Sequence, residues 1–360
     1  MAIARDYLSY LVERKGSDLH VKAGAAPYVR IGGRLAKSDF APLSEDDTER
    51  TAMDLMDGDQ ARRFKERGEV DFAYMLDDLG RFRVNIFRQR GAVGIAARRV
   101  LPGSPSFETL GLPPVVKTLA EEERGLILVT GPTSSGKTTT TGAVINHINH
   151  TRSCHILTIE DPIEILHHDR NAIVNQREIG LDTQDFATAL RAAMRQDPDV
   201  IFVGEIRDFE TVTAALQAAE TGHLVISTLH TTDVSETVNR IIDFYPPSHQ
   251  KQARVSLGAS LKGIVSQRLL PRRDGRGLIP AVEVLVANGR IHDLILNPDQ
   301  THMIRDIVAE SSFYGMQTFD QALLTLYRAG MVSLEEAERT ATSSHDFKIA
   351  LRQEGLQPVS

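Results

Sequence analysis

The chain has 360 residues, 41% of them hydrophobic and 25% charged, which is typical of a globular protein long enough for two or three domains. With 41 basic and 48 acidic residues its net charge is −7, which argues against a protein whose main role is to grip nucleic acid. The single cysteine, Cys154, excludes a disulfide framework, and the apolar runs are far shorter than the ~20 residues that span a bilayer. No signal peptide is recognisable, so we expect a cytoplasmic protein.

The first hundred residues predict a small α+β domain with an antiparallel sheet, residues 1–101. Apolar spacing in residues 3–12 predicts an opening helix, and Gly32 with Gly33 is a two-residue hairpin signal. Ser44 followed by Asp47 resembles a capping box, which predicts a helix over 45–56. Three strand-like runs follow, at 70–75, 81–88 and 92–100.

The rest of the chain predicts a different architecture. Four prolines in 102–116 indicate a linker. Over 117–287, short apolar runs alternate with helical patterns, which favours an α/β domain of the RecA-like kind with a parallel sheet covered on both faces. Residues 288–360 are predicted to form a helical C-terminal region, in which Ser333 and Glu336 indicate one helix start.

One segment matches the P-loop pattern G-x-x-x-x-G-K-[ST] at every defined position. An apolar run at 126–129 precedes it and a helical pattern at 139–150 follows, which is the strand, loop and helix order that phosphate binding requires. Lys137 is expected to reach the β and γ phosphates of ATP, and the Thr138 hydroxyl to bind Mg²⁺. The predicted ATP-binding residues are Gly131, Pro132, Thr133, Ser134, Ser135, Gly136, Lys137, Thr138 and Thr139.

Two acidic segments follow the P-loop, and each has two interpretations. In the first, Glu164 either activates the attacking water or completes a capping box, with Asp161 as N-cap and Pro162 at N1. In the second, four apolar residues lead to Gly204 and Glu205, so Glu205 is either a Walker B carboxylate acting on magnesium or a solvated strand end.

His223 and His230 lie at the two ends of one apolar strand. Their odd spacing predicts that they point to opposite faces of a regular strand. A histidine at the carboxyl end of a strand could sense the γ-phosphate, and two satisfied polar histidines are the alternative.

Together these segments resemble the secretion and type IV pilus ATPases, and most closely the PilT/PilU retraction ATPases. The resemblance rests on several stretches in family order and covers nearly the whole chain. These stretches are residues 16–20 (GSDLH), 81–85 (RFRVN), 158–164 (TIEDPIE), 174–178 (VNQRE), 197–200 (DPDV), 204–208 (GEIRD), 219–223 (AETGH) and 228–231 (TLHT).

The resemblance implies a PAS-like first domain and a RecA-like second domain, assembled as a hexameric ring. It implies that Glu164 is the catalytic glutamate, that Glu205 is the Walker B glutamate and that His223 and His230 form a histidine box. It also implies arginine fingers from the first domain.

Arg83 fits a finger independently, because strand alternation places it opposite the apolar face of residues 81–88. Strand alternation favours Arg98 as the second finger. The sequence distance to Pro102 resembles the family pattern better for Arg99, and we predict Arg98.

The function that this resemblance implies is ATP-driven retraction of a type IV pilus by a homo-hexamer at the cytoplasmic face of the inner membrane. The implied partners are an inner-membrane platform protein and a second retraction ATPase, and no nucleic acid is expected. The alternatives are an assembly ATPase, a RecA-like DNA translocase and a regulatory ATP-binding module without turnover. Residues 289–296 keep the apolar spacing of the helix that follows the motor in PilT-type ATPases but lose much of its charge, and residues 315–323 and 326–330 resemble the PilU branch, which predicts an accessory motor. The alternative is that this region simply packs as helices on the motor domain.

Overall fold

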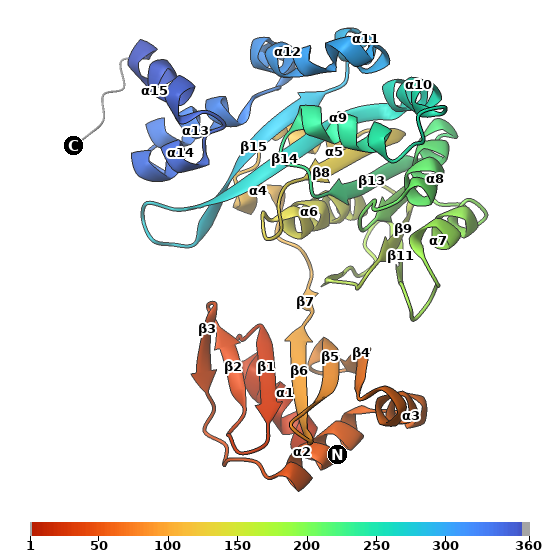
Figure 1. Ribbon diagram of the computed structural model, residues 1–360, viewed down its shortest axis with the longest axis vertical. Coiled ribbons are helices and arrows are strands. Elements are labelled where there is room, and N and C mark those ends of the chain that lie inside the picture. The colour runs from red at the N-terminus through yellow and green to blue at the C-terminus, as the bar shows by residue number, and fades with distance from the viewer. Residues whose placement is uncertain (1, 355–360) are drawn as a thin grey trace. The chain divides into compact units, whose positions relative to one another are not determined.

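The computed structural model describes residues 2–354, and the chain separates into two compact units, Met1–Pro102 and Gly103–Ser360 (Figure 1). Each unit has its own sheet and its own hydrophobic core. Among the described residues, no helix combines the length and apolar character that crossing a membrane requires.

The first unit is an antiparallel six-stranded sheet, with strand order β3-β2-β1-β6-β5-β4. Its core lies between one face of the sheet and three helices, and it includes Leu11, Phe64 and Ile86. Asp47 closes the predicted capping box with Ser44. The elements are α1 (Ala2–Glu13), β1 (Asp18–Lys22), β2 (Tyr28–Ile31), β3 (Arg34–Lys37), α2 (Glu45–Leu55), α3 (Gly58–Arg67), β4 (Glu69–Leu76), β5 (Gly80–Gln89), β6 (Ala92–Arg99) and β7 (Leu101–Pro102).

The second unit is built on a seven-stranded sheet, with order β11-β9-β12-β13-β8-β14-β15. All neighbouring strands are parallel except β14 and β15, which form an antiparallel hairpin. The strands are β8 (Gly125–Thr130), β9 (His155–Glu160), β11 (Ile173–Glu178), β12 (Val200–Val203), β13 (Leu224–Leu229), β14 (Leu261–Pro271) and β15 (Leu278–Val286), and the short β10 (Ile165–Leu166) lies outside this sheet.

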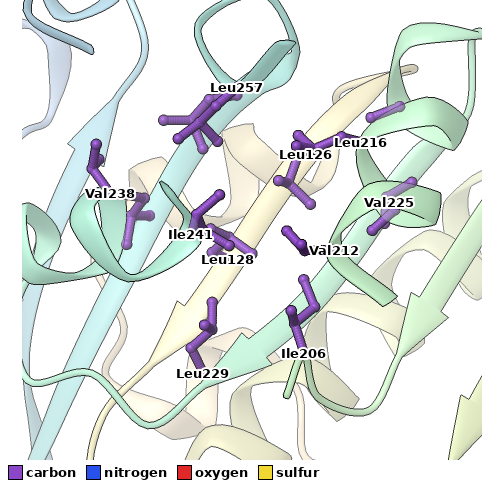
Figure 2. Packing of buried hydrophobic residues seen from close by; sticks show 14 of the residues in the cluster. Leu126, Leu128, Ile206, Val212, Leu216, Val225, Leu229, Val238, Ile241 and Leu257 are labelled. Carbon is purple, nitrogen blue, oxygen red and sulfur yellow. The ribbon is translucent and has the colours of Figure 1, made fainter. Parts of the chain in front are cut away.

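Helices cover both faces of this sheet, as the near-continuous apolar strands predict. One face packs against α7 (Phe186–Ala193), α8 (Phe209–Glu220), α9 (Val234–Asp243), α10 (Gln250–Ser260), α11 (Gly289–Leu296) and α12 (Ile304–Glu310). In Figure 2, Leu126 and Leu128 of β8 lie among the buried side chains of this layer. The other face packs against α5 (Pro114–Ala120) and α6 (Lys137–Thr151).

A third, smaller core lies at the β14–β15 hairpin. Leu270 and Ile279 of the hairpin pack there with Phe319, Phe347 and other side chains of the last helices. The remaining elements are α4 (Phe107–Leu110), η1 (Pro298–Met303), η2 (Ser312–Tyr314), α13 (Phe319–Arg328), α14 (Leu334–Thr340) and α15 (Ser344–Gln353).

The compact units divide the chain differently from the four predicted segments. The predicted linker, 102–116, contains α4 and the start of α5, and Val116 is buried in the core of the second unit. The predicted boundary at 287/288 crosses a continuous core, because Ile291 and Ile295 of α11 pack with the strands. Helices α11 and α12 are therefore part of the helix layer on this face of the sheet.

Glu283 of β15 is a buried carboxylate in this sheet, and only 3% of it is exposed. It accepts a hydrogen bond of 2.9 Å from the backbone N–H of Val234, the first residue of α9. Burial raises the pKa of Glu283 to about 7, and the nearby negative charge of Asp233 adds to the rise, whereas this hydrogen bond and the charges of Arg268 and Arg305 oppose it.

We expect Glu283 to make the protein less stable as the pH rises. Its folded-state pKa of about 7 lies above the ordinary value of 4.5, so unfolding releases a proton between these two values. The free energy of unfolding should therefore fall from about pH 4.5 to about pH 7, by at most ~1.4 kcal/mol per pH unit from this group. Glu283→Gln should remove this contribution, which denaturant unfolding at pH 5 and pH 8 measures. If the free energies of unfolding of variant and wild type differ by the same amount at both pH values, the predicted contribution of Glu283 is contradicted.

Candidate active site

The P-loop connects β8 to α6 at the carboxyl edge of the sheet, and its backbone requires glycine at two points. Gly131 has φ 145° and Gly136 has φ 91°, both in the region that favours glycine. A Cβ added to Gly131 would lie 2.5 Å from both the Gln267 carbonyl oxygen and the Ser135 Oγ. The buried Gln267 side chain also donates to the Ser135 carbonyl, at 3.1 Å. The loop is therefore held against β14 in one shape.

The N-terminus of α6 differs from those of the three α-helices that follow it in the chain. The helices α7, α8 and α9 begin after Asp185, Asp208 and Asp233, and each aspartate accepts a backbone N–H of the first turn. In contrast, α6 begins after Gly136, without a side-chain cap and without an acidic residue in its first turn. Because free N–H groups and the helix dipole favour an anion, this helix start suits a phosphate group.

Lys137 lies half-buried at the centre of the loop. Its ammonium donates to the carbonyl oxygens of Gly131, at 2.8 Å, and Pro132, at 3.0 Å. Burial lowers the pKa of Lys137, and the negative charges of Glu205 and Glu164 oppose this shift. Both predicted acidic residues thus act electrostatically on the P-loop lysine.

His230 connects Lys137 to Glu205. The His230 Nδ1 lies 3.5 Å from the Lys137 Nζ, and its Nε2 lies 3.4 Å from the Glu205 Oε2. An ammonium can only donate, so this contact is a hydrogen bond in the tautomer that has a bare Nδ1 and carries its proton on Nε2, toward the carboxylate. The three residues follow β8, β13 and β12, which are adjacent strands whose carboxyl ends meet at one edge. The structure therefore brings Lys137 of the predicted Walker A loop, the predicted Walker B residue Glu205 and His230 together.

Arg207 is a site residue that the sequence argument did not single out. It forms an ion pair with Glu205 through Nη2, and its Nη1 lies 3.8 Å from the Asp161 Oδ2. The hydrogen bond to Glu205 raises the pKa of Arg207. Its position two residues after Glu205 was the one sequence signal for Arg207. Its contact with Asp161 depends on the pairing of β12 with β9.

Glu164 lies between β9 and β10, and its side chain is exposed. No helix starts at Asp161, since residues 161–164 lead directly into β10, so the capping-box interpretation of Glu164 is wrong. The negative charge of Glu164 raises the pKa of Lys137, so the carboxylate lies within electrostatic range of the P-loop. The site thus contains a carboxylate free to contact water.

His223 lies away from this cluster, at the amino end of β13. The two histidines are seven positions apart, or about 23 Å along an extended strand. The Nδ1 of His223 donates to the Ala218 carbonyl at 2.9 Å. Within one chain, His223 therefore does not join His230 at the P-loop.

In the first unit, Arg83 and Arg98 lie directly opposite each other on β5 and β6. Their side chains are 50% and 72% exposed, on the face of the sheet opposite the core. Arg98 Nε donates to Asp18 Oδ1 at 2.8 Å. Like charges opposite each other across strands are unfavourable, and here each arginine has a carboxylate partner, Asp71 for Arg83 and Asp18 for Arg98.

Arg99 has a different environment from Arg98. It lies opposite Phe82, whose ring is fully buried in the core, and its Nε is buried. The geometry therefore favours Arg98 over Arg99 as the partner of Arg83 on the exposed face.

For Mg²⁺, the residues present fit a site shared with phosphate oxygens. No group of three His, Cys, Asp or Glu side chains among residues 2–354 forms a protein-only metal site. Magnesium in nucleotide sites is commonly held by one or two protein oxygens together with phosphates. Two residues supply oxygens of this kind. Thr138 lies in the first turn of α6, and Glu205 is connected to Lys137 by the contacts of His230.

Comparison with known proteins agrees with this architecture. The family described as type II/IV secretion system protein matches residues 107–338. The type IV pilus ATPase PilU of Pseudomonas aeruginosa is 41% identical over 96% of this chain and 90% of its own length. The retraction ATPase PilT of the same organism is 39% identical over 95% of this chain and 99% of its own length.

Among solved structures, a crystal structure of the pilus retraction motor PilT with bound ADP matches with a TM-score of 0.90 and 44% identity. The match covers 97% of this chain and 99% of that one. These matches confirm the predicted α/β fold class and the predicted ATPase activity. The chain belongs to the PilT/PilU family of type IV pilus retraction ATPases.

Proposed function

We propose that this chain is a motor ATPase that hydrolyses ATP with Mg²⁺, as a ring of six copies, to drive retraction of a type IV pilus. The observation that carries the proposal is the chain of contacts from Lys137 through His230 to Glu205. These contacts join Lys137, which is expected at the phosphates, to Glu205, which is expected at the metal. A change at the γ-phosphate would therefore affect both residues.

Each site residue has a distinct role in this mechanism. The glycine loop and the uncapped start of α6 bind the phosphates, and Lys137 neutralises charge on the β and γ groups. Thr138 and Glu205 would hold Mg²⁺, which supplies charge neutralisation on the phosphate oxygens when bound. Glu164 orients or deprotonates the attacking water.

Arg83 and Arg98 act on nucleotide as arginine fingers. The support is their position as an exposed like-charge pair on a rigid sheet, with Arg98 held by Asp18. His230 also acts at the transferred phosphate. Its contact of 3.4 Å with Glu205 couples the presence of that phosphate to the Glu205 carboxylate. We assign no role at the nucleotide of the same chain to His223, which lies at the other end of β13.

We propose that the ring works at the cytoplasmic face of the inner membrane, against a platform protein of the pilus. We also propose that it assists a main retraction ATPase, as the C-terminal resemblance to PilU suggests. The identity to PilU, 41%, is nearly equal to the identity to PilT, 39%, so this second proposal rests on the C-terminal residues alone.

A steady-state ATPase assay on size-separated protein tests the proposal. We expect turnover in the hexamer fraction, dependent on Mg²⁺ and unchanged by DNA. Turnover stimulated severalfold by DNA would favour a translocase instead. Nucleotide binding without turnover in any fraction would favour a regulatory module.

A further inference from the structure

Two buried glutamates hold the backbone of the segment that carries Glu164. Glu160, at the end of β9, and Glu178, at the end of β11, are each 8% exposed. The Glu178 Oε2 accepts the backbone N–H of Ile163 at 3.1 Å, and the Glu160 Oε1 accepts a hydrogen bond from the Gln176 side chain. Glu178 therefore fixes one peptide of this segment directly, and Glu160 acts on the segment through Gln176.

Gln176 of β11 fixes the continuation of the same segment. Its Nε2 donates to both the Glu160 Oε1, at 3.1 Å, and the Ile165 carbonyl, at 2.9 Å. Its Oε1 accepts the backbone N–H of His167 at 2.8 Å. One amide thus connects Glu160 to the backbone on the far side of Glu164.

Glu160 is costly to bury, and the structure offsets this cost. Thr158 Oγ1 donates to the Glu160 Oε1 at 2.6 Å. Burial raises the pKa of Glu160 to about 7 and the charge of Glu164 adds to the rise, whereas the hydrogen bonds from Thr158, Gln176 and the Glu164 backbone oppose it. An apolar residue at this position would avoid the desolvation cost, so the carboxylate is best explained by its hydrogen bond to the Gln176 amide.

We propose that Glu160, with Gln176, is a positioning residue that sets the place of Glu164 relative to the P-loop. The inference rests on the proposed role of Glu164 at the attacking water. Gln176 fixes the backbone that directly follows Glu164, and Glu160 holds the Gln176 amide in place, so together they set where the Glu164 side chain starts. A displacement of about 1 Å in a reacting group can cost ~10²-fold in rate. Neither Glu160 nor Gln176 needs to touch ATP to have this effect.

A double-mutant cycle tests the proposal, with single-turnover ATP hydrolysis by the full-length hexamer as the measurement. We expect Glu160→Ala to lower kcat by about 10- to 10²-fold while the KM for ATP stays within about twofold. In the Glu164→Gln background, the same change should slow hydrolysis by less than about twofold, because the group that it positions is already lost. Thermal melting checks that each variant is folded.

If Glu160→Ala does not fold, Gln176→Leu replaces it in the same cycle, with the same expectation. Glu283→Ala is the matched control, because Glu283 is another buried carboxylate of the same sheet, with its hydrogen bond at α9. Any effect of Glu283→Ala on kcat should be equal in both backgrounds.

Two results would overturn the inference, and they differ from a failure of the proposed function. If Glu164→Gln is impaired and Glu160→Ala still lowers kcat by the same factor in that background, the positioning role is rejected while the role of Glu164 stands. A raised KM with an unchanged kcat in Glu160→Ala would reject the positioning role in the same way. Wild-type turnover in Glu164→Gln by itself would reject the role of Glu164, and the positioning role with it.

Discussion

Glu164→Gln should bind ATP with near-normal affinity and hydrolyse it about 10²–10⁴-fold more slowly, which is the usual contribution of a general base. The amide keeps the size of the side chain and cannot accept the water proton. The capping alternative is already excluded by the absence of a helix at residues 161–164. Nucleotide affinity by equilibrium binding and turnover by phosphate release are the two measurements.

Lys137→Ala is the matched comparison for this variant. It removes the ammonium at the centre of the P-loop, so nucleotide affinity and turnover should fall together. Equal affinity and near-normal turnover in Glu164→Gln would contradict the water-activation role. Normal affinity in Lys137→Ala would contradict the phosphate role of the loop.

Arg83→Ala should lower ATP turnover by about 10³–10⁵-fold, the range measured for arginine fingers. This corresponds to about 4–7 kcal/mol of transition-state stabilisation. Stability should change little, because the side chain is 50% exposed and its ion pair with Asp71 has an N–O distance of 3.8 Å. Turnover per folded molecule, with thermal melting, measures both quantities.

Arg88→Ala is the control on the same strand. Arg88 stacks over Phe64 and pairs with Glu49, on the helix side of the sheet, so its loss should leave turnover near normal. Arg98→Ala should behave like Arg83→Ala, and Arg99→Ala should mainly affect stability. A melted fold with unchanged activity per folded Arg83→Ala molecule would make Arg83 structural.

Local sequence signals predicted the parts of the fold that depend on neighbouring residues. The P-loop, the Gly32–Gly33 turn and the Ser44 cap each lie within a few positions of the groups they organise. Helix α3 was missed because Phe64 is its only buried residue and leaves no apolar periodicity, although Asp57 and Gln60 form a capping box there. Strand β1 is short and carries Asp18 and His20, which weakens its apolar pattern.

Contacts between distant strands were not predictable in the same way. Gln176 and Glu178 reach the Glu164 segment only because β11 pairs with β9, and Arg207 meets Asp161 only because β12 pairs with β9. His223 was grouped with His230 by family resemblance, whereas strand geometry separates them. The prolines of 102–116 indicated a linker, yet Val116 contributes to a core that depends on β8 and α6.

The account is tested most directly by the retraction of fluorescently labelled pili in cells that carry the gene, lack it, or carry Lys137→Ala. We predict that cells without the protein still assemble pili but retract them more weakly, and that Lys137→Ala reproduces this defect. In cells that lack their main retraction ATPase, this protein alone should retract pili weakly or not at all. Strong retraction in those cells would contradict the accessory assignment. Loss of surface pili on deletion, or normal retraction with Lys137→Ala, would contradict an ATP-driven retraction motor.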